Sequence, residues 1–294
     1  MYALVIASQK GGSGKTTLSG HLAVEAQNAN VGPVALIDTD PQGSLSHWWN
    51  ARAAQTPLFA RVGLLDLAGA LEELRAGGVK LAVIDTPPAI TDSISRVIAH
   101  ADLVILPTRP SPHDLRAVGA TVNIAERHAK PVLFVINAAT PRARITGEAA
   151  VALSQHGTVA PVTIHHRVDF AASMVDGRTV GEIVPKSASA KEIRDLWIYV
   201  QDRLARLGRD AAMSPEIVPQ NFAVSALSGF GEADAAEAES AEAMEPPPFD
   251  GVPLAAGGER RSGADRRQAP PGTPFNGPER RVHVFGRRSS DHRI

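Results

Sequence analysis

Residues 10–17 read KGGSGKTT, and their types and spacing are suited to binding phosphate. Glycines let backbone N–H groups converge on phosphate oxygens, and the N-terminus of a following helix adds partial positive charge. Lys15 can reach the outer phosphates, and the hydroxyl of Thr16 can bind Mg²⁺. We therefore expect a nucleotide to bind along Gly11, Gly12, Ser13, Gly14, Lys15, Thr16 and Thr17. Gln9 replaces the usual first glycine of this pattern, and Lys10 adds a second lysine.

Three aspartates follow apolar runs. Asp38 and Asp40 belong to LIDTDPQG, and Asp85 belongs to VIDTPP. Because side chains alternate along a strand, we expect Asp38 and Asp40 to share one face. The carboxyl ends of parallel strands meet at the edge where a phosphate loop lies. The three acids are therefore predicted to hold a metal ion and its waters beside the loop.

These residues need a parallel sheet to bring them together. Apolar runs without alternation, typical of strands buried on both faces, occupy 3–8, 33–40, 80–88, 102–108 and 131–138. Segments of helical period lie at 16–28, 64–76, 93–99 and 114–128, and a weak strand at 160–165 and a helix at 190–207 close the pattern. The fold class is α/β, a mostly parallel twisted sheet with helices on both faces.

The composition changes near residue 207, which divides the chain into two predicted parts. Residues 1–207 form the folded domain, and 208–294 form a disordered tail. The tail has an acidic stretch at 232–245, prolines at 246–248 and four arginine doublets within 259–294. Two interpretations stay open for it: a pair of short interaction motifs on a flexible tether, or a solvated segment with no specific role.

The global composition excludes several classes. The formal net charge is −1, so binding to nucleic acid or an anionic membrane requires a local patch. The absence of cysteine excludes disulfides and iron–sulfur clusters. We find neither a secretory leader nor an apolar run long enough for a membrane helix, and predict a cytoplasmic protein.

In combination and order, KGGSGKTT, LIDTDPQG and VIDTPP resemble the deviant Walker A, switch-type acidic and Walker B motifs of the ParA/MinD family of P-loop ATPases. The resemblance covers about residues 1–205. It implies ATP and Mg²⁺ as cofactors and an ATP-sandwich homodimer in which Lys10 reaches the partner's nucleotide. A lysine supplied this way would act as an arginine finger does, so assembly would gate hydrolysis. The alternative for Lys10 is an exposed loop lysine.

The resemblance also implies roles for the remaining motif residues. Lys15 and Thr16 would hold phosphates and Mg²⁺. Asp38 and Asp85 would bind the metal or its waters, and Asp40 would orient or activate the attacking water. Asn137, in FVINA, matches the position where family members read the adenine.

Family members position plasmids, chromosomes and other cargo. The resemblance therefore implies an ATPase switch that binds nonspecific DNA, associates with the nucleoid when ATP-bound, and is stimulated by a ParB-like or other cargo adaptor protein. Residues 164–182 are similar to the DNA-binding segment of ParA proteins, although His165–His166 replace the usual proline–arginine pair. Candidate DNA contacts by position are Arg167, Arg178, Lys186, Lys191 and Arg194. Charged residues on a last helix are more ordinarily a solvated face.

Two other functions stay open. A MinD-like membrane switch would dock a C-terminal amphipathic helix on lipid, but a glycine and two serines interrupt the apolar face of 280–294. A P-loop metabolic enzyme would need a further small-molecule site, which the sequence does not reveal, and its nitrogenase-like branch would need cysteines.

Overall fold

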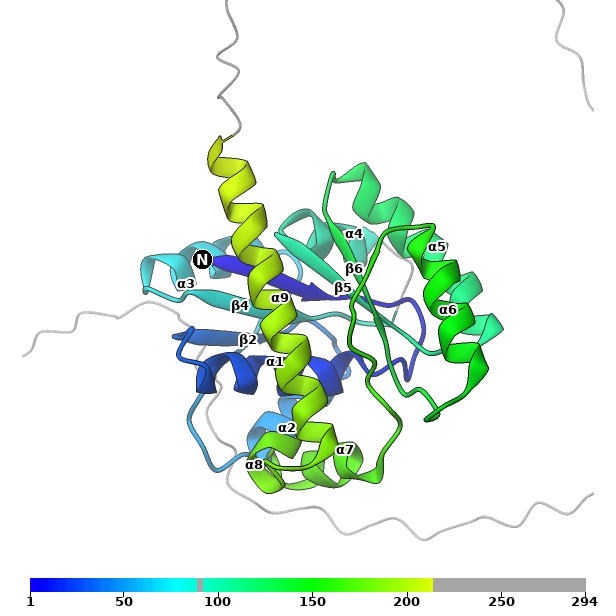
Figure 1. Ribbon diagram of the computed structural model, residues 1–294. Coiled ribbons are helices and arrows are strands. Elements are labelled where there is room, and N and C mark those ends of the chain that lie inside the picture. Colours follow the sequence, from blue (N-terminus) through cyan, green and yellow to red (C-terminus); the bar gives the residue numbers. More distant parts are fainter. Residues whose placement is uncertain (89–91, 214–294) are drawn as a thin grey trace, which may run out of the picture. The chain divides into compact units, whose positions relative to one another are not determined.

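The computed structural model describes residues 1–88 and 92–213 (Figure 1). Within them, seven strands form one parallel sheet in the order β3-β2-β4-β1-β5-β6-β7. The strands are β1 (Tyr2–Ile6), β2 (Val34–Asp38), β3 (Leu58–Arg61), β4 (Leu81–Asp85), β5 (Leu103–Thr108), β6 (Val132–Ile136) and β7 (Thr158–Val159). The central strands are buried on both faces, which explains their unbroken apolar runs.

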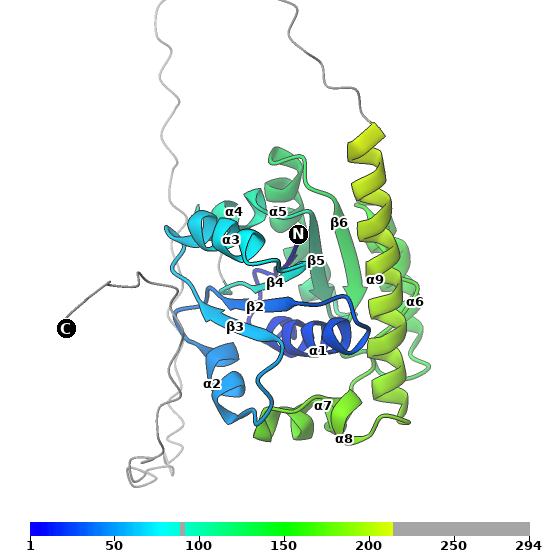
Figure 2. The same cartoon turned by 90° about the vertical axis from the view of Figure 1, so that its left-hand side faces the viewer.

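Helices cover both faces of the sheet (Figure 2). They are α1 (Lys15–Asn28), α2 (Ser44–Ala51), α3 (Leu67–Ala76), α4 (Asp92–Ala99), α5 (Pro112–Arg127), α6 (Arg144–Ser154), α7 (Val168–Ser173), α8 (Val180–Ile183) and α9 (Ala188–Met213), with a short 3-10 turn at Met174–Asp176. One apolar cluster joins α1, α2, α7, α8 and α9 to the sheet. A second joins α3, α4, α5 and α6 to the opposite face. The predicted α/β class is confirmed.

The parallel register brings the predicted site to one edge. Asp38 of β2 is paired with Asp85 of β4, and Ile6 at the end of β1 is paired with Asp85 on the other side. The loop that follows β1 therefore begins beside Asp85, and Asp38 lies one strand farther along the same edge. No helix in the part of the chain that the structure describes is long and apolar enough to cross a membrane.

The strand predicted over 160–165 is wrong. The strand β7 ends at Val159, and Pro161 interrupts further pairing because it has no N–H. Ala160 and Ile164 still donate to carbonyl oxygens of β6 at 2.8 and 2.9 Å, so the segment follows β6 without forming a regular strand.

The last helix is longer than predicted. The prediction ended it at 207, but α9 continues through Gly208 to Met213. Gly208 packs against Tyr2, and an added Cβ there would overlap the tyrosine hydroxyl, so this glycine serves a close contact. No apolar run or helical period predicted β3 or α6, and α3 begins at Leu67, three residues after the predicted start at 64. The predicted tail beyond 213 lies outside the described residues.

Candidate active site

The loop between β1 and α1 has the backbone conformation that its glycines predict. Gly12 and Gly14 have φ angles of +71° and +97°, in the left-handed region that favours glycine. At Gly14 an added Cβ would also overlap the amide nitrogen of Asn137. That amide donates to the carbonyl oxygen of Ser13 at 2.7 Å. The loop is thus held against the end of β6, and α1 begins directly behind it at Lys15.

The side chain of Lys15 lies inside this loop. The residue is 7% exposed, and its Nζ lies 3.5 Å from the carbonyl oxygen of Lys10. Burial lowers its pKa, although the negative charges of Asp85 and Asp40 oppose the shift. An anion beside a buried ammonium favours its charged form. The position therefore suits a lysine that binds phosphate.

Asp85 ends β4 beneath the start of α1. It accepts hydrogen bonds from the hydroxyls of Thr16 at 2.8 Å and Ser19 at 3.1 Å. Burial, with a further contribution from the charge of Asp38, raises the pKa of Asp85 to about 7, against the hydrogen bonds of Thr16 and Ser19 and the charge of Lys15. The fold therefore holds an acid whose charge is costly until a cation joins it.

Asp38 and Asp40 do not share a strand face, which corrects the prediction. The strand β2 ends at Asp38, so the alternation does not extend to Asp40. Asp38 is fully buried and accepts from the backbone N–H and hydroxyl of Ser46 at 2.9 and 2.6 Å. Asp40 is half-buried, and its carboxylate accepts from the N–H of Gln42 at 2.9 Å. Asp38 is thus fixed by α2, whereas Asp40 lies in the turn before it.

Oxygen-bearing side chains meet between the loop and the two strand ends. Thr16 is bonded to Asp85, and Asp38 lies beside Asp85 in the register. Hydroxyl and carboxylate oxygens are the donors that Mg²⁺ takes from proteins, and it completes its shell with waters and substrate phosphates. In residues 1–88 and 92–213 no three acidic or histidine side chains form a metal cage. The donor set therefore fits Mg²⁺ that binds together with a nucleotide.

Lys10 is paired within its own chain. Its Nζ lies 2.6 Å from Oδ2 of Asp114 near the start of α5, and the Ser111 hydroxyl donates to the same oxygen. Burial alone would raise the pKa of Asp114, but hydrogen bonds from Lys10 and Ser111, with the charges of Lys10 and Arg109, lower it. The Lys10 side chain remains 40% exposed, and no motif predicted Asp114 as its partner.

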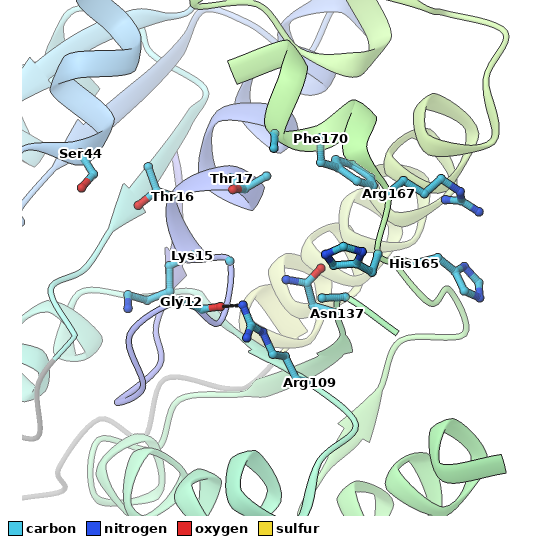
Figure 3. A pocket seen from close by; sticks show the side chains of 14 residues that line it. Gly12, Lys15, Thr16, Thr17, Ser44, Arg109, Asn137, His165, Arg167 and Phe170 are labelled. Atoms are coloured by element: carbon cyan, nitrogen blue, oxygen red, sulfur yellow. Dashed lines mark hydrogen bonds between the residues drawn. The ribbon is translucent and has the colours of Figure 1, made fainter. Parts of the chain in front are cut away.

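A cavity of about 440 Å³ opens beside the loop (Figure 3). One end is formed by Gly12, Gly14, Lys15 and Thr16, and the other includes His165, Arg167 and Phe170. Asn137 lies beside the loop, bonded to Ser13, between these two ends. Arg109 lies between these ends and donates to the carbonyl oxygen of Gly12. Asn137 is therefore placed where a ligand anchored on the loop would extend.

His165 and Arg167 are joined by an acid on α9. The Glu192 carboxylate accepts from Nδ1 of His165 at 2.8 Å and from its backbone N–H at 3.1 Å. It also accepts from Arg167 at 2.6 Å. Sequence reasoning assigned His165 no role and missed Glu192. The one feature of the sequence that pointed to His165 was the histidine pair that replaces the usual proline–arginine pair.

The basic candidates for DNA contact lie in two places. Arg167 lines the cavity, whereas the others follow one another between 178 and 194. Three of the latter have acidic neighbours: Arg178 with Asp176, Lys191 with Asp195, and Arg194 with Glu25 at 3.7 Å. Lys186 is exposed. The structure thus brings the second group to one exposed stretch before and along α9.

That stretch is connected to helices that start at the site. Arg52, directly after α2, donates to the carbonyl oxygen of Gly177 at 2.9 Å and forms a two-point ion pair with Glu182 at 2.7 and 2.9 Å. His21 of α1 accepts at Nε2 from the N–H of Val180 at 3.2 Å while its Nδ1 faces the Thr17 carbonyl at 2.7 Å. Residues 177–182 therefore contact both the helix after the phosphate loop and the end of α2.

Comparison with known proteins also indicates a nucleotide-binding domain. The family model for the CobQ/CobB/MinD/ParA nucleotide binding domain matches residues 4–180. A protein of Halothiobacillus neapolitanus named maintenance of carboxysome distribution protein A is 29% identical over 204 residues, which are 65% of this chain and 92% of the relative. The protein of the same name in Gloeobacter kilaueensis is 42% identical over 129 residues, or 42% of this chain and 56% of the relative.

A solved structure shares the fold. The septum site-determining protein MinD from Pyrococcus horikoshii, solved with Mg-ADP, superposes with a TM-score of 0.58 at 17% identity. The match covers 70% of this chain and 98% of the solved chain.

Proposed function

The chain belongs to the CobQ/CobB/MinD/ParA nucleotide-binding family, and on that premise we propose that it is an ATP hydrolase whose ATP-bound form dimerises to position an intracellular cargo. One observation supports this most strongly. Thr16 of the phosphate loop is hydrogen-bonded at 2.8 Å to Asp85, which lies in register with Asp38, so phosphate-binding and metal-binding groups form one site.

Within one copy, the loop binds the nucleotide phosphates. Backbone N–H groups of residues 11–17 and the N-terminus of α1 bind the phosphate oxygens, and Lys15 neutralises their charge. Thr16, Asp38 and Asp85 hold Mg²⁺, which supplies positive charge to the phosphates when bound. Asp40, less buried than Asp38 and free of the Ser46 contact, orients the attacking water. Its carboxylate is the predicted acceptor for the proton of that water.

Lys10 connects hydrolysis to assembly. In the single chain it pairs with Asp114, and its side chain is exposed enough to leave that partner. In the ATP-bound homodimer Lys10 contacts the nucleotide of the other copy and stabilises charge in the transition state. Neither copy then hydrolyses ATP efficiently alone.

The cargo role follows from the relatives. The proteins from Halothiobacillus and Gloeobacter are named for maintaining carboxysome distribution, and we assign this chain to the same class of positioning ATPase, acting in the cytoplasm. The dimer binds nonspecific DNA of the nucleoid, with contacts from Arg167, Arg178, Lys186, Lys191 and Arg194. A ParB-like or other adaptor protein on the cargo stimulates hydrolysis and releases the DNA. The ATPase activity belongs to the domain predicted over 1–207, and the tail binds an additional partner.

Four variants test this assignment. Lys15→Ala should lose ATP binding, Lys10→Ala should bind ATP without turnover, and Asp40→Ala should form the ATP dimer without turnover. Lys80→Ala is the matched control, because Lys80 is an exposed lysine just before β4, at the opposite end of the strand from the site. Phosphate release and light scattering with ATP and Mg²⁺ provide the readouts.

DNA retention completes the test. Wild type should bind nonspecific DNA only with ATP, and its affinity should fall steeply with salt. An Asp40→Ala chain that stays monomeric with ATP would show that Asp40 is misassigned. Brisk turnover that requires a metabolite and ignores DNA would contradict the positioning function.

A further inference from the structure

The end of the cavity farthest from the phosphate loop presents a histidine in a fixed orientation. His165 lines the cavity, and its Nδ1 is hydrogen-bonded to Glu192 at 2.8 Å (Figure 3). The second bond from Glu192, to the backbone N–H of His165 at 3.1 Å, limits rotation of the residue. Because Glu192 is an acceptor, Nδ1 carries the proton of the neutral ring, and Nε2 is left as an acceptor.

The position of Nε2 follows from the shape of the ring. The two nitrogens lie on different sides of the imidazole, so Nε2 faces away from Glu192. No residue that the structure describes forms a hydrogen bond with Nε2. Arg167, the nearest cation in this cluster, is itself directed to Glu192 at 2.6 Å. Nε2 is therefore left free to accept a hydrogen bond from a ligand in the cavity that His165 lines.

Asn137, which lies between the phosphate loop and His165, presents a second acceptor. Its Nδ2 is used by the carbonyl oxygen of Ser13 at 2.7 Å, which can only accept, so the side-chain oxygen is the atom left for a ligand. A nucleotide anchored by its phosphates on Gly12, Gly14 and Lys15 can extend its base along the cavity, past Asn137 toward His165. The base then meets two acceptors.

We infer that His165, positioned by Glu192, accepts a hydrogen bond from the 6-amino group of adenine and sets the preference of this site for adenine over guanine nucleotides. Guanine carries an oxygen at that position, which would face an acceptor and leave it unpaired. This inference rests on the proposed nucleotide-binding function and adds a base-reading residue to it. Glu192 is a positioning residue, since it acts through the ring of His165.

A ligand-by-variant cycle tests the inference on the full chain. The ligands are ADP, purine riboside diphosphate, which lacks the 6-amino group, and GDP, all titrated calorimetrically with Mg²⁺ near pH 8. For wild type we expect ADP to bind roughly threefold to tenfold more tightly than purine riboside diphosphate, the usual range for one hydrogen bond. His165→Ala should weaken the binding of ADP by that factor and leave the affinity for purine riboside diphosphate unchanged.

Further variants separate positioning from packing. Glu192→Ala should reduce the preference for ADP as His165→Ala does. The double variant should lose no more of this preference than either single variant, because both residues act through one hydrogen bond. His156→Ala, which changes an exposed histidine just after α6, is the matched control. The preference for ADP over GDP should fall in the His165 and Glu192 variants alone.

The outcomes are distinguishable. If His165→Ala weakens ADP and purine riboside diphosphate equally, or changes neither, the base-reading role is refuted while nucleotide binding stands. A wild-type preference for GDP would also refute it, because that requires a donor at Nε2. If the wild type binds no nucleotide, the proposed function itself fails.

Discussion

Asp85→Asn should stabilise the nucleotide-free protein while it removes the predicted metal site. Asp85 is 1% exposed, and burial raises its pKa to about 7 from an ordinary value of 3.8. An asparagine has nearly the same shape and can still accept from Thr16. Its amide can donate to the hydroxyl of Ser19, whose proton is also within reach of the Lys15 carbonyl at 3.0 Å. The substitution therefore removes the cost of the charge with little loss of contacts.

The sign and size of this change in stability follow from proton linkage. Between pH 3.8 and about 7 the folded chain keeps a proton that the unfolded chain has released, so wild-type stability falls as pH rises through this range. The full separation corresponds to about 4 kcal/mol. The advantage of Asp85→Asn should thus grow by roughly 1.4 kcal/mol per pH unit between pH 5 and 7 and become constant above that.

Urea unfolding of both proteins without metal or nucleotide, at several pH values from 5 to 8, measures this difference. Other titrating groups contribute equally to both proteins and cancel. Asp66→Asn changes an exposed carboxyl and should give a small, constant difference. A difference for Asp85→Asn that does not change with pH, or one that shrinks as pH rises, would refute the burial of an unfavourable charge at this site. The variant should also lose the added stability that ATP and Mg²⁺ give the wild type.

Three further predictions concern the surrounding network. Burial lowers the pKa of His21 to about 4 from 6.5, so the stability that the neutral ring contributes is fully present above about pH 6.5 and is lost as pH falls through about 4. In urea unfolding, His21→Gln should remove roughly 3 kcal/mol of this pH-dependent loss of stability. Asp114→Asn should free Lys10 and tighten the ATP-dependent dimer by roughly threefold to tenfold in light scattering, with no effect in a Lys10→Ala background. Arg52→Ala leaves Glu182 half-buried and without its two-point partner, and should lower the free energy of unfolding by roughly 3 kcal/mol.

Local patterns were sufficient to predict the central layer. The apolar runs and glycines of 1–138 predicted five strands and the phosphate loop, because those strands are buried on both faces and leave a clear signal. The edge strand β3 is partly exposed and has no such signal. Pro161 broke a predicted strand through its missing N–H, which a count of apolar residues does not register.

The site was less predictable because several of its contacts join distant segments. Lys15, Thr16 and Asp85 could be inferred from motifs, since strand ends of a parallel sheet meet at one edge. The partners Asp114 and Glu192 lie 104 and 27 residues from the side chains they hold. Only the packed fold brings such pairs together, and neither acid belongs to a motif.

The central claim is that Lys10 of one copy serves the nucleotide of the other. Mixing Lys10→Ala and Asp40→Ala chains tests it, because each variant is expected to be inactive alone. In a mixed dimer the site that retains Asp40 receives Lys10 from its partner, whereas the other site lacks both. Equal mixing produces half mixed dimers with one intact site each, so we expect about a quarter of wild-type ATP turnover in a twofold-symmetric dimer. Turnover that stays at the level of the separate variants, despite mixed dimers detected by cross-linking, would contradict the account.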